Sequence, residues 1–295
     1  MNLSTLLERL PRKGVEGLAF PSNLLGTFRR KSISFCTGVT DETTIVYWVQ
    51  SKSFSIDLRL SEAAATPVAE RQGWVGDTMW DDTTKLLSWH IEKSYQPRIQ
   101  WPEPAGLSFI GNCVLEFAPS GAYVEDWRQT SSAGPFLGLR LVSMLNEVTG
   151  KESPVDGGLV ITGEHAAFAQ SRLPEVDDVL RQAASIDEAL ATGLVTEAEI
   201  ESYEVSVAVG GRAITHSTQS GRVGQTIGEG DFSIRSDGKI AQERLVGGEL
   251  YLLLYEVDVF EPEFTFVRQT PSTSEARDWM EQEKRHLARH AVAIS

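Results

Sequence analysis

The sequence has little of what marks a chain for export, for a membrane or for a metal. Its only two cysteines, Cys36 and Cys113, lie far apart and lack the CxxC or Cys/His spacing of a zinc site or disulfide framework. The opening residues, MNLSTLLERLPRKG, contain no apolar core of a secretory signal, and no apolar run approaches the roughly 18 residues of a membrane span. We therefore expect a cytoplasmic protein that is neither exported nor inserted into a membrane.

Positive charge is also scarce. The chain has 27 Lys and Arg residues against 41 Asp and Glu residues, which gives a net charge of −14. A surface of that sign repels polyanions, so we expect no nucleic-acid partner. Phosphate-binding loops and the G-x-S-x-G elbow are missing as well. His286 and His290, at i and i+4 on the predicted terminal helix, could bind a metal, but we expect them to lie on a solvated helix face. We accordingly expect no cofactor and no bound metal.

Alternating strands dominate what is present. Residues 44–50, TIVYWVQ, and residues 54–60, FSIDLRL, flank a short turn and predict a hairpin. A second hairpin is predicted over Cys113–Gln129, around Ser120-Gly121. A short helix is predicted over residues 3–10, a longer one over Val176–Ala191 and a terminal one over Thr273–Ala291. The basic residues 29–31 are expected to form a solvated turn.

The hairpins recur later in the chain. Residues 158–172 match the first hairpin at an offset of 113, Tyr203–Val209 matches Leu87–Lys93 at 116, and Asp231–Val246 matches Cys113–Gln129 at 117. Such a small drift is typical of a duplicated domain with altered loops. We therefore predict an N-terminal docking segment (1–34), a first barrel (35–150), a second barrel (151–270) and a C-terminal helix (271–295).

This order of strands, carried by Phe54–Leu60, Cys113–Gln129 and their repeats, resembles the calycin and lipocalin-like β-barrels. The tandem copy looks like the two-barrel lipocalin-like proteins. The resemblance implies a mainly β fold with two tandem antiparallel barrels, short helices and a small-molecule cavity. It implies a small hydrophobic or aromatic ligand, and it leaves a homodimer open.

Glu125 is the main catalytic candidate because strand alternation places it on one face with Tyr123 and Trp127. A carboxyl among aromatic neighbours tends to have a raised pKa, which suits acid/base chemistry, and Tyr123 could assist by hydrogen bonding. If that face is solvated, Glu125 is instead an ordinary surface charge.

Asp57, Arg59 and His90 are further candidates. Asp57 and Arg59 are two residues apart on one strand face, so Arg59 could hold an oxygen-bearing group beside its ion-pair partner. His90 could move a proton near neutral pH. An outward, solvated Asp/Arg pair and a structural histidine are the alternatives.

The two copies differ at these positions. In the sequence match, Gln170 stands for Asp57, Ser206 for His90 and Gln242 for Glu125, whereas Arg59 is kept as Arg172. Drift of surface residues would give the same pattern as the loss of a proton-handling site from the second copy. The shared arginine would then be architectural.

Tryptophans gather in the first copy, where they would either fill the core or form the apolar wall of a ligand pocket. The second repeat, residues 158–260, contains none. We assign the wall to Trp80, Trp89 and Trp127, from a group that also includes Trp74 and Trp101.

These residues favour a cofactor-independent lyase or isomerase that acts on a small aromatic or apolar, oxygen-bearing molecule in the first barrel. A carrier or sensor using the same cavity, and an interaction scaffold with solidly packed barrels, are the alternatives.

Overall fold

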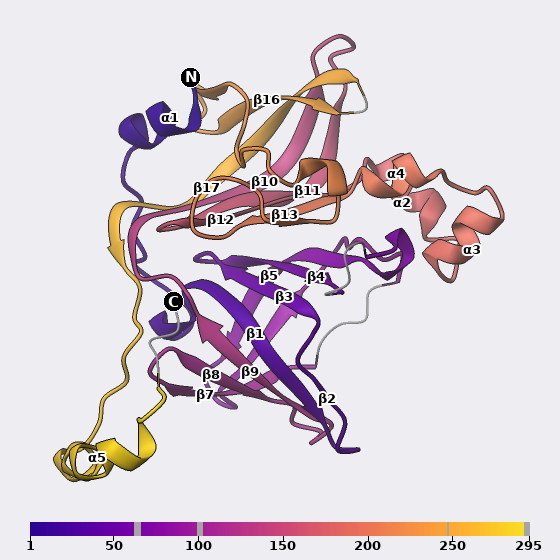
Figure 1. Cartoon of the computed structure of the whole chain (residues 1–295). Helices are drawn as coiled ribbons and strands as arrows, with labels where there is room; N and C mark the ends of the chain where they lie inside the picture. The colour runs from indigo at the N-terminus through magenta and orange to yellow at the C-terminus, as the bar shows by residue number, and fades with distance from the viewer. Residues whose placement is uncertain (62–65, 99–102, 247, 292–295) are drawn as a thin grey trace.

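The computed structural model describes residues 1–61, 66–98, 103–246 and 248–291. Two antiparallel sheets make up most of it, one with strands from residues 26–129 and one with strands from residues 133–265. Figure 1 shows the second sheet lying across the outside of the first. The predicted mainly β class is confirmed.

The first sheet closes into an eight-stranded barrel, because β1 pairs with β9 as well as with β3. The short β2 only extends the β1 end of the sheet. Its strands are β1 (Gly26–Phe35), β2 (Thr40–Asp41), β3 (Ile45–Gln50), β4 (Phe54–Leu60), β5 (Gln72–Asp81), β6 (Leu86–His90), β7 (Ala105–Ile110), β8 (Cys113–Phe117) and β9 (Tyr123–Gln129). The barrel thus begins at Gly26, within the segment predicted to be an N-terminal lead-in.

The second sheet has the order β14-β13-β12-β11-β10-β17-β16-β15 and stays open, so the expected second closed barrel is not formed. Its strands are β10 (Ala133–Asn146), β11 (Glu152–Thr162), β12 (His165–Gln170), β13 (Glu204–Ala208), β14 (His216–Ser217), β15 (Phe232–Ile234), β16 (Ile240–Val246) and β17 (Glu249–Thr265). The break falls between β14 and β15, which are both very short. To close the sheet, β14 and β15 would have to form a ladder of backbone hydrogen bonds, and they are too short for that.

The strand orders of the two sheets nevertheless agree. With β10 in the place of β1 and β17 in the place of β9, the open sheet repeats the order of the barrel and breaks where the barrel has β6 beside β7. That seam is weak even in the barrel, where β6 and β7 share only two residue pairs. The two sheets therefore share one strand order.

The strand pairing contradicts two of the residue matches that the sequence comparison made between the two copies. Because β13 pairs directly with β12, it takes the place of β5, so Ser206 does not stand for His90 on β6. The β15–β16 hairpin lies one strand further from β10 than the β8–β9 hairpin lies from β1, so Gln242 does not stand for Glu125. The match of β3–β4 with β11–β12 is kept.

The helices are short. They are α1 (Leu3–Arg9), α2 (Pro174–Leu180), α3 (Ile186–Ala191), α4 (Glu197–Glu201) and α5 (Ser274–Leu287), with 3-10 turns at Ser22–Leu24, Val68–Glu70 and Ser220–Arg222. The single helix predicted over Val176–Ala191 is two helices, because Ser185 turns extended and caps α3 by accepting from the Glu188 N–H. No helix in the described part of the chain is both long and apolar enough to cross a membrane.

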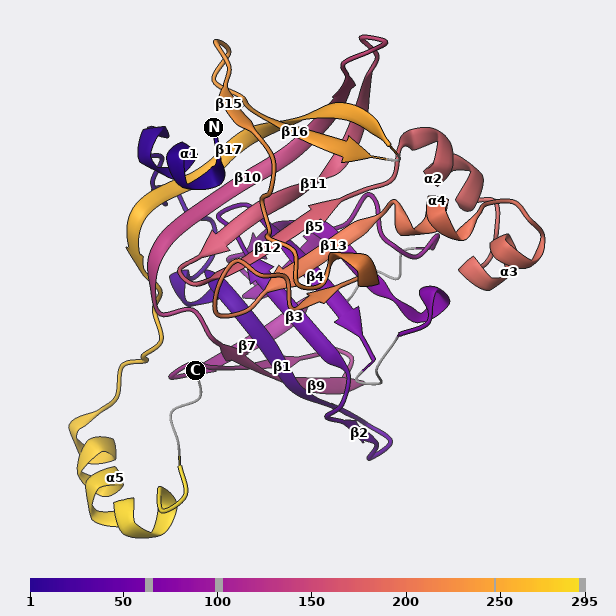
Figure 2. The same ribbon diagram turned by 45° about the horizontal axis from the view of Figure 1, so that its top comes forward.

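The outer face of the barrel is buried against the second sheet. Phe54, Ile56 and Leu58 on β4 are fully buried in one cluster with Val205 and Val207 of β13. Figure 2 shows β12 and β13 crossing over β3 and β4. Because the apolar face of β4 is used for this contact, its polar face is left to line the inside of the barrel.

The face of the second sheet that is turned away from the barrel packs against α1. Leu6 is fully buried in a cluster with Leu159, Phe168, Phe232 and Tyr255. The expected docking helix is therefore present, and it packs on the open sheet (Figure 1).

Candidate functional site

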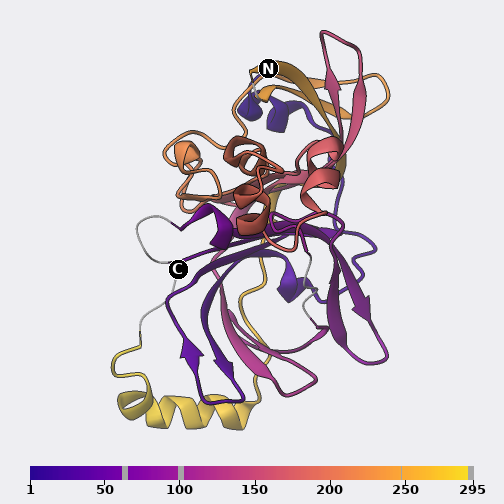
Figure 3. The same ribbon diagram turned by 90° about the vertical axis from the view of Figure 1, so that its right-hand side faces the viewer.

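The barrel contains a cavity of about 1040 Å³ that opens to solvent. Figure 3 turns the molecule so that the barrel lies below the second sheet. At the end where β1 begins, Leu24 and Leu25 are fully buried in the same apolar cluster as Trp48 and Trp127. Gln129 holds this segment by donating from Nε2 to the Leu25 carbonyl at 2.7 Å.

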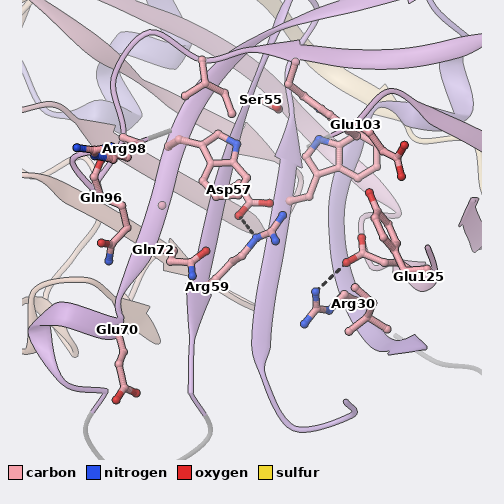
Figure 4. Close-up of a pocket in the computed structure, with 18 of the residues that line it drawn as sticks. Arg30, Ser55, Asp57, Arg59, Glu70, Gln72, Gln96, Arg98, Glu103 and Glu125 are labelled. Carbon is pink, nitrogen blue, oxygen red and sulfur yellow. Dashed lines mark hydrogen bonds and ion pairs between the residues drawn. The ribbon is translucent and has the colours of Figure 1, made fainter. Parts of the chain in front are cut away.

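Carboxyl groups from four strands and arginines from two face the cavity. Asp57 and Arg59 project from β4, Arg30 from β1, Glu116 from β8, Tyr123 and Glu125 from β9, and Asp41 from β2. Figure 4 shows the Asp57–Arg59 and Arg30–Glu125 ion pairs along one wall. The sequence correctly grouped Asp57 with Arg59, and Tyr123 with Glu125, on faces that share a direction.

Glu125 is 4% exposed, so it is no surface charge. Its Oε1 accepts from Arg30 Nη1 at 2.8 Å and its Oε2 accepts from Trp127 Nε1 at 3.1 Å. Arg30 is 6% exposed and also pairs with Asp41 at 3.1 Å. The basic residues 29–31 therefore lie within β1 rather than in a solvated turn.

A β-bulge explains the position of Arg30. The register between β1 and β9 shifts between Arg30 and Ser32, so Arg30 and Ile33 both line the cavity despite being three residues apart. Simple alternation cannot place both side chains on one face. Nothing in the local sequence pattern marks this extra residue.

Glu116 is a buried carboxyl that the sequence reasoning passed over. It is 3% exposed, lies directly opposite Glu125 in the β8–β9 hairpin and accepts from the same Trp127 N–H at 3.1 Å. Burial, and then the nearby charge of Glu125, raise the pKa of Glu116 well above its usual range. The sequence contains a signal for Glu116, because a hairpin that turns at Ser120-Gly121 pairs residue 116 with residue 125.

Asp57 and Arg59 form the second polar group. Arg59 Nε donates to Asp57 Oδ1 at 2.9 Å, and the guanidinium lies 4.5 Å from the ring centre of Trp74. Burial raises the pKa of Asp57, and Arg59 opposes that rise. Among the described residues no group accepts from the Nη nitrogens of Arg59, so this planar fork can bind a ligand oxygen.

Two more hydroxyl groups face the cavity. Ser55 is 1% exposed, and its Oγ has no hydrogen-bond partner among the described residues. Burial, together with Glu116 and Glu125, raises the pKa of Tyr123, which keeps its hydroxyl a proton donor. Buried polar groups normally have partners, so the bare Ser55 hydroxyl favours a ligand or water there.

Tryptophans form the apolar wall. Trp89 and Trp127 line the cavity as predicted, together with Trp48 and Trp74. Trp48 packs edge-on against both Trp89 and Trp127 at 5.8 Å. Trp80 is half-buried, bonds to Asp82 and is not part of the described lining. Trp101 lies outside the described residues.

His90 does not face the cavity. It is exposed on the outer side of β6, whereas its strand neighbour Trp89 points inward. Arg172, the counterpart of Arg59, is fully buried between the rings of Tyr95 and Tyr203 and donates to the Tyr95 and Ile200 carbonyls. It therefore has the structural role that the sequence comparison suggested.

Comparisons of the chain with models of protein families, with curated proteins and with solved structures gave no match.

Proposed function

We propose that the barrel is a cofactor-independent lyase or isomerase that moves a proton on a small aromatic or apolar, oxygen-bearing molecule. The main observation behind this proposal is that Glu116 and Glu125 lie opposite each other on the cavity wall. The raised pKa of Glu116 supports a protonated acid, and the hydrogen bonds from Arg30 and Trp127 support a carboxylate base at Glu125.

In this mechanism Glu125 removes a proton from the carbon beside a substrate carbonyl. The electron pair moves onto the carbonyl oxygen, where the free fork of Arg59 and the Tyr123 hydroxyl stabilise the negative charge. Glu116 then gives its proton either to the far carbon of a carbon–carbon double bond conjugated with the enolate, which shifts that double bond and completes an isomerisation, or to a leaving group departing from the β-carbon, which completes an elimination. Asp57 holds Arg59 in position.

The charge of the lining supports a neutral substrate. Among the lining residues that the structure describes, six carry carboxyl groups and three carry guanidinium groups, namely Asp41, Asp57, Glu70, Glu103, Glu116 and Glu125 against Arg30, Arg59 and Arg98. An anionic molecule would meet net repulsion, whereas the tryptophan wall suits a flat neutral ring. Both cysteines are free, which suits a reducing compartment such as the cytoplasm.

The cavity volume supports a ligand-binding role over a scaffold with solidly packed barrels.

A measurement of proton exchange distinguishes an enzyme from a carrier, because only an enzyme speeds the exchange of substrate protons with solvent. Phenylacetone, a neutral aromatic ketone with acidic C–H bonds, is incubated with the protein in D₂O, and loss of its C–H signals is followed by NMR.

We expect catalysed exchange that Glu125→Gln slows by about 10²- to 10⁴-fold and Glu116→Gln slows less, because Glu116 acts only after the C–H bond is broken. His90→Ala is the matched control on the outer face and leaves exchange unchanged. Binding without exchange, or equal exchange in all three variants, would reject the enzyme and leave the carrier.

A further inference from the structure

The C-terminal helix α5 has no packing partner of comparable size in the described part of the chain. None of its 14 residues is buried, and the large side chains Trp279, Met280 and Leu287 are 54%, 59% and 60% exposed. Figures 1 and 2 both show it standing off from the two sheets. Three large apolar side chains on one isolated helix are a feature that packing normally covers.

The sequence nevertheless encodes this helix strongly. Thr273 caps its first turn by accepting from the Ala276 N–H at 3.1 Å, Glu275 lies in the first turn, and Lys284, Arg285 and His286 lie in the last. An isolated helix of this length is only marginally stable in water. Its stability must therefore come largely from packing its apolar stripe on something else.

The chain holds the start of α5 close to the barrel. Phe266 is buried in the barrel cluster, and Thr270 Oγ1 accepts from the Gly111 N–H at 3.2 Å. The apolar stripe consists of Ala276, Trp279, Met280 and Leu287, which recur at helical spacing. Since the anchor lies only a few residues before the helix, the stripe is displayed near the barrel.

The charges of α5 identify the partner. Residues 274–283 carry four acidic groups and one basic group, a net charge of 1 − 4 = −3. Residues 284–290 carry Lys284, Arg285 and Arg289 and no acidic group, a net charge of +3 with the histidines neutral. Each half of the helix is thus complementary to the other half of an identical helix that runs the opposite way.

We propose that α5 pairs with α5 of a second copy of this chain, antiparallel, to form a homodimer. The pairing sets Ala276 of one copy near Leu287 of the other, and Trp279 and Met280 near the partner's helix centre. Glu275 and Asp278 then lie beside the basic half of the partner helix. A parallel pair would instead place like charges together, which is unfavourable.

Light scattering over a concentration series tests the dimer, with two charge-reversed variants of the full chain. One carries Lys284→Glu, Arg285→Glu and Arg289→Glu, and the other carries Glu275→Lys, Asp278→Lys and Glu281→Lys. We expect the native chain to dimerise weakly, because one helix pair is a small interface. Each variant alone should dissociate at least about tenfold more readily, and an equimolar mixture should restore the dimer.

Disulfide cross-linking tests the direction, in a Cys36→Ser and Cys113→Ser background. Chains with Ala276→Cys should cross-link to chains with Leu287→Cys and should not cross-link to one another. A native chain that stays monomeric at every concentration overturns the proposal. So does a dimer that neither charge variant weakens, or self-cross-linking of Ala276→Cys.

Discussion

Glu116 and Glu125 lie directly opposite each other on neighbouring strands, and the indole N–H of Trp127 is 3.1 Å from an oxygen of each carboxyl group. Two buried carboxyl groups this close do not readily ionise together, so one of them holds a proton. Of these two carboxyl groups, Glu125 is the one that pairs with Arg30, and the proton therefore belongs on Glu116. This asymmetry makes one group an acid and the other a base.

Replacing Glu116 by Gln should make stability less dependent on pH. The pKa of Glu116 is raised by folding above its ordinary value of 4.5, so the unfolded chain loses this proton first as pH rises. The stabilising contribution is complete below that value and is lost as pH rises through the folded pKa. Melting temperatures should agree at pH 4, and Glu116→Gln should melt higher at pH 8, by about 2–4 °C for each kcal/mol. A difference that does not grow with pH would contradict this assignment.

Arg30→Gln should destabilise the protein by about 3–5 kcal/mol, because it leaves the Glu125 carboxylate buried without its cation. Adding Glu125→Gln to that variant should recover much of the loss, since a buried amide needs no counter-charge. Urea unfolding of the two single variants and the double variant measures the coupling. If the losses of unfolding free energy in the two single variants simply add in the double variant, the ion pair with Glu125 is not what holds Arg30 in place.

The contact between the sheets can be tested at Gly73 on β5. A Cβ there would lie 2.7 Å from Val205 Cγ2 on β13, so Gly73→Ala should cost about 1–3 kcal/mol by overpacking. Val205→Ala removes the clashing methyl group and should restore part of the stability when the two changes are combined. If Val205→Ala gives no relief, the two sheets do not meet as described.

The ligand should be selected by charge. Phenylacetone and phenylacetate have similar shapes, but only the second is an anion, and the acidic lining disfavours it. We expect phenylacetone to bind at least about tenfold more tightly, as measured by quenching of tryptophan fluorescence. Ser55→Trp, which inserts a large ring at the bare hydroxyl, should abolish quenching by ligand. Tighter binding of phenylacetate would contradict the neutral-substrate proposal.

Much of the fold could be read from local pattern. Period-two alternation and the Ser120-Gly121 turn predict the β8–β9 hairpin, and a hairpin centred between Ser120 and Gly121 also sets Glu116 opposite Glu125. The repeated hairpins predict the duplicated strand order, although single correspondences slipped by one strand where loops differ in length. Helical spacing likewise predicts α1 and α5.

The direction in which each face points was decided only by the tertiary structure. The alternation in β4 separates Asp57 and Arg59 from Phe54 and Ile56 in any environment, but the second sheet buries the apolar face and so turns the charges into the cavity. Arg30 reaches the site through a bulge, and the second sheet stays open because β14 and β15 are too short to pair. Local pattern thus determined the strands and the neighbours across each hairpin. Contacts between distant segments determined which side of the barrel became the site, because burial depends on what packs against a strand and not on the strand alone.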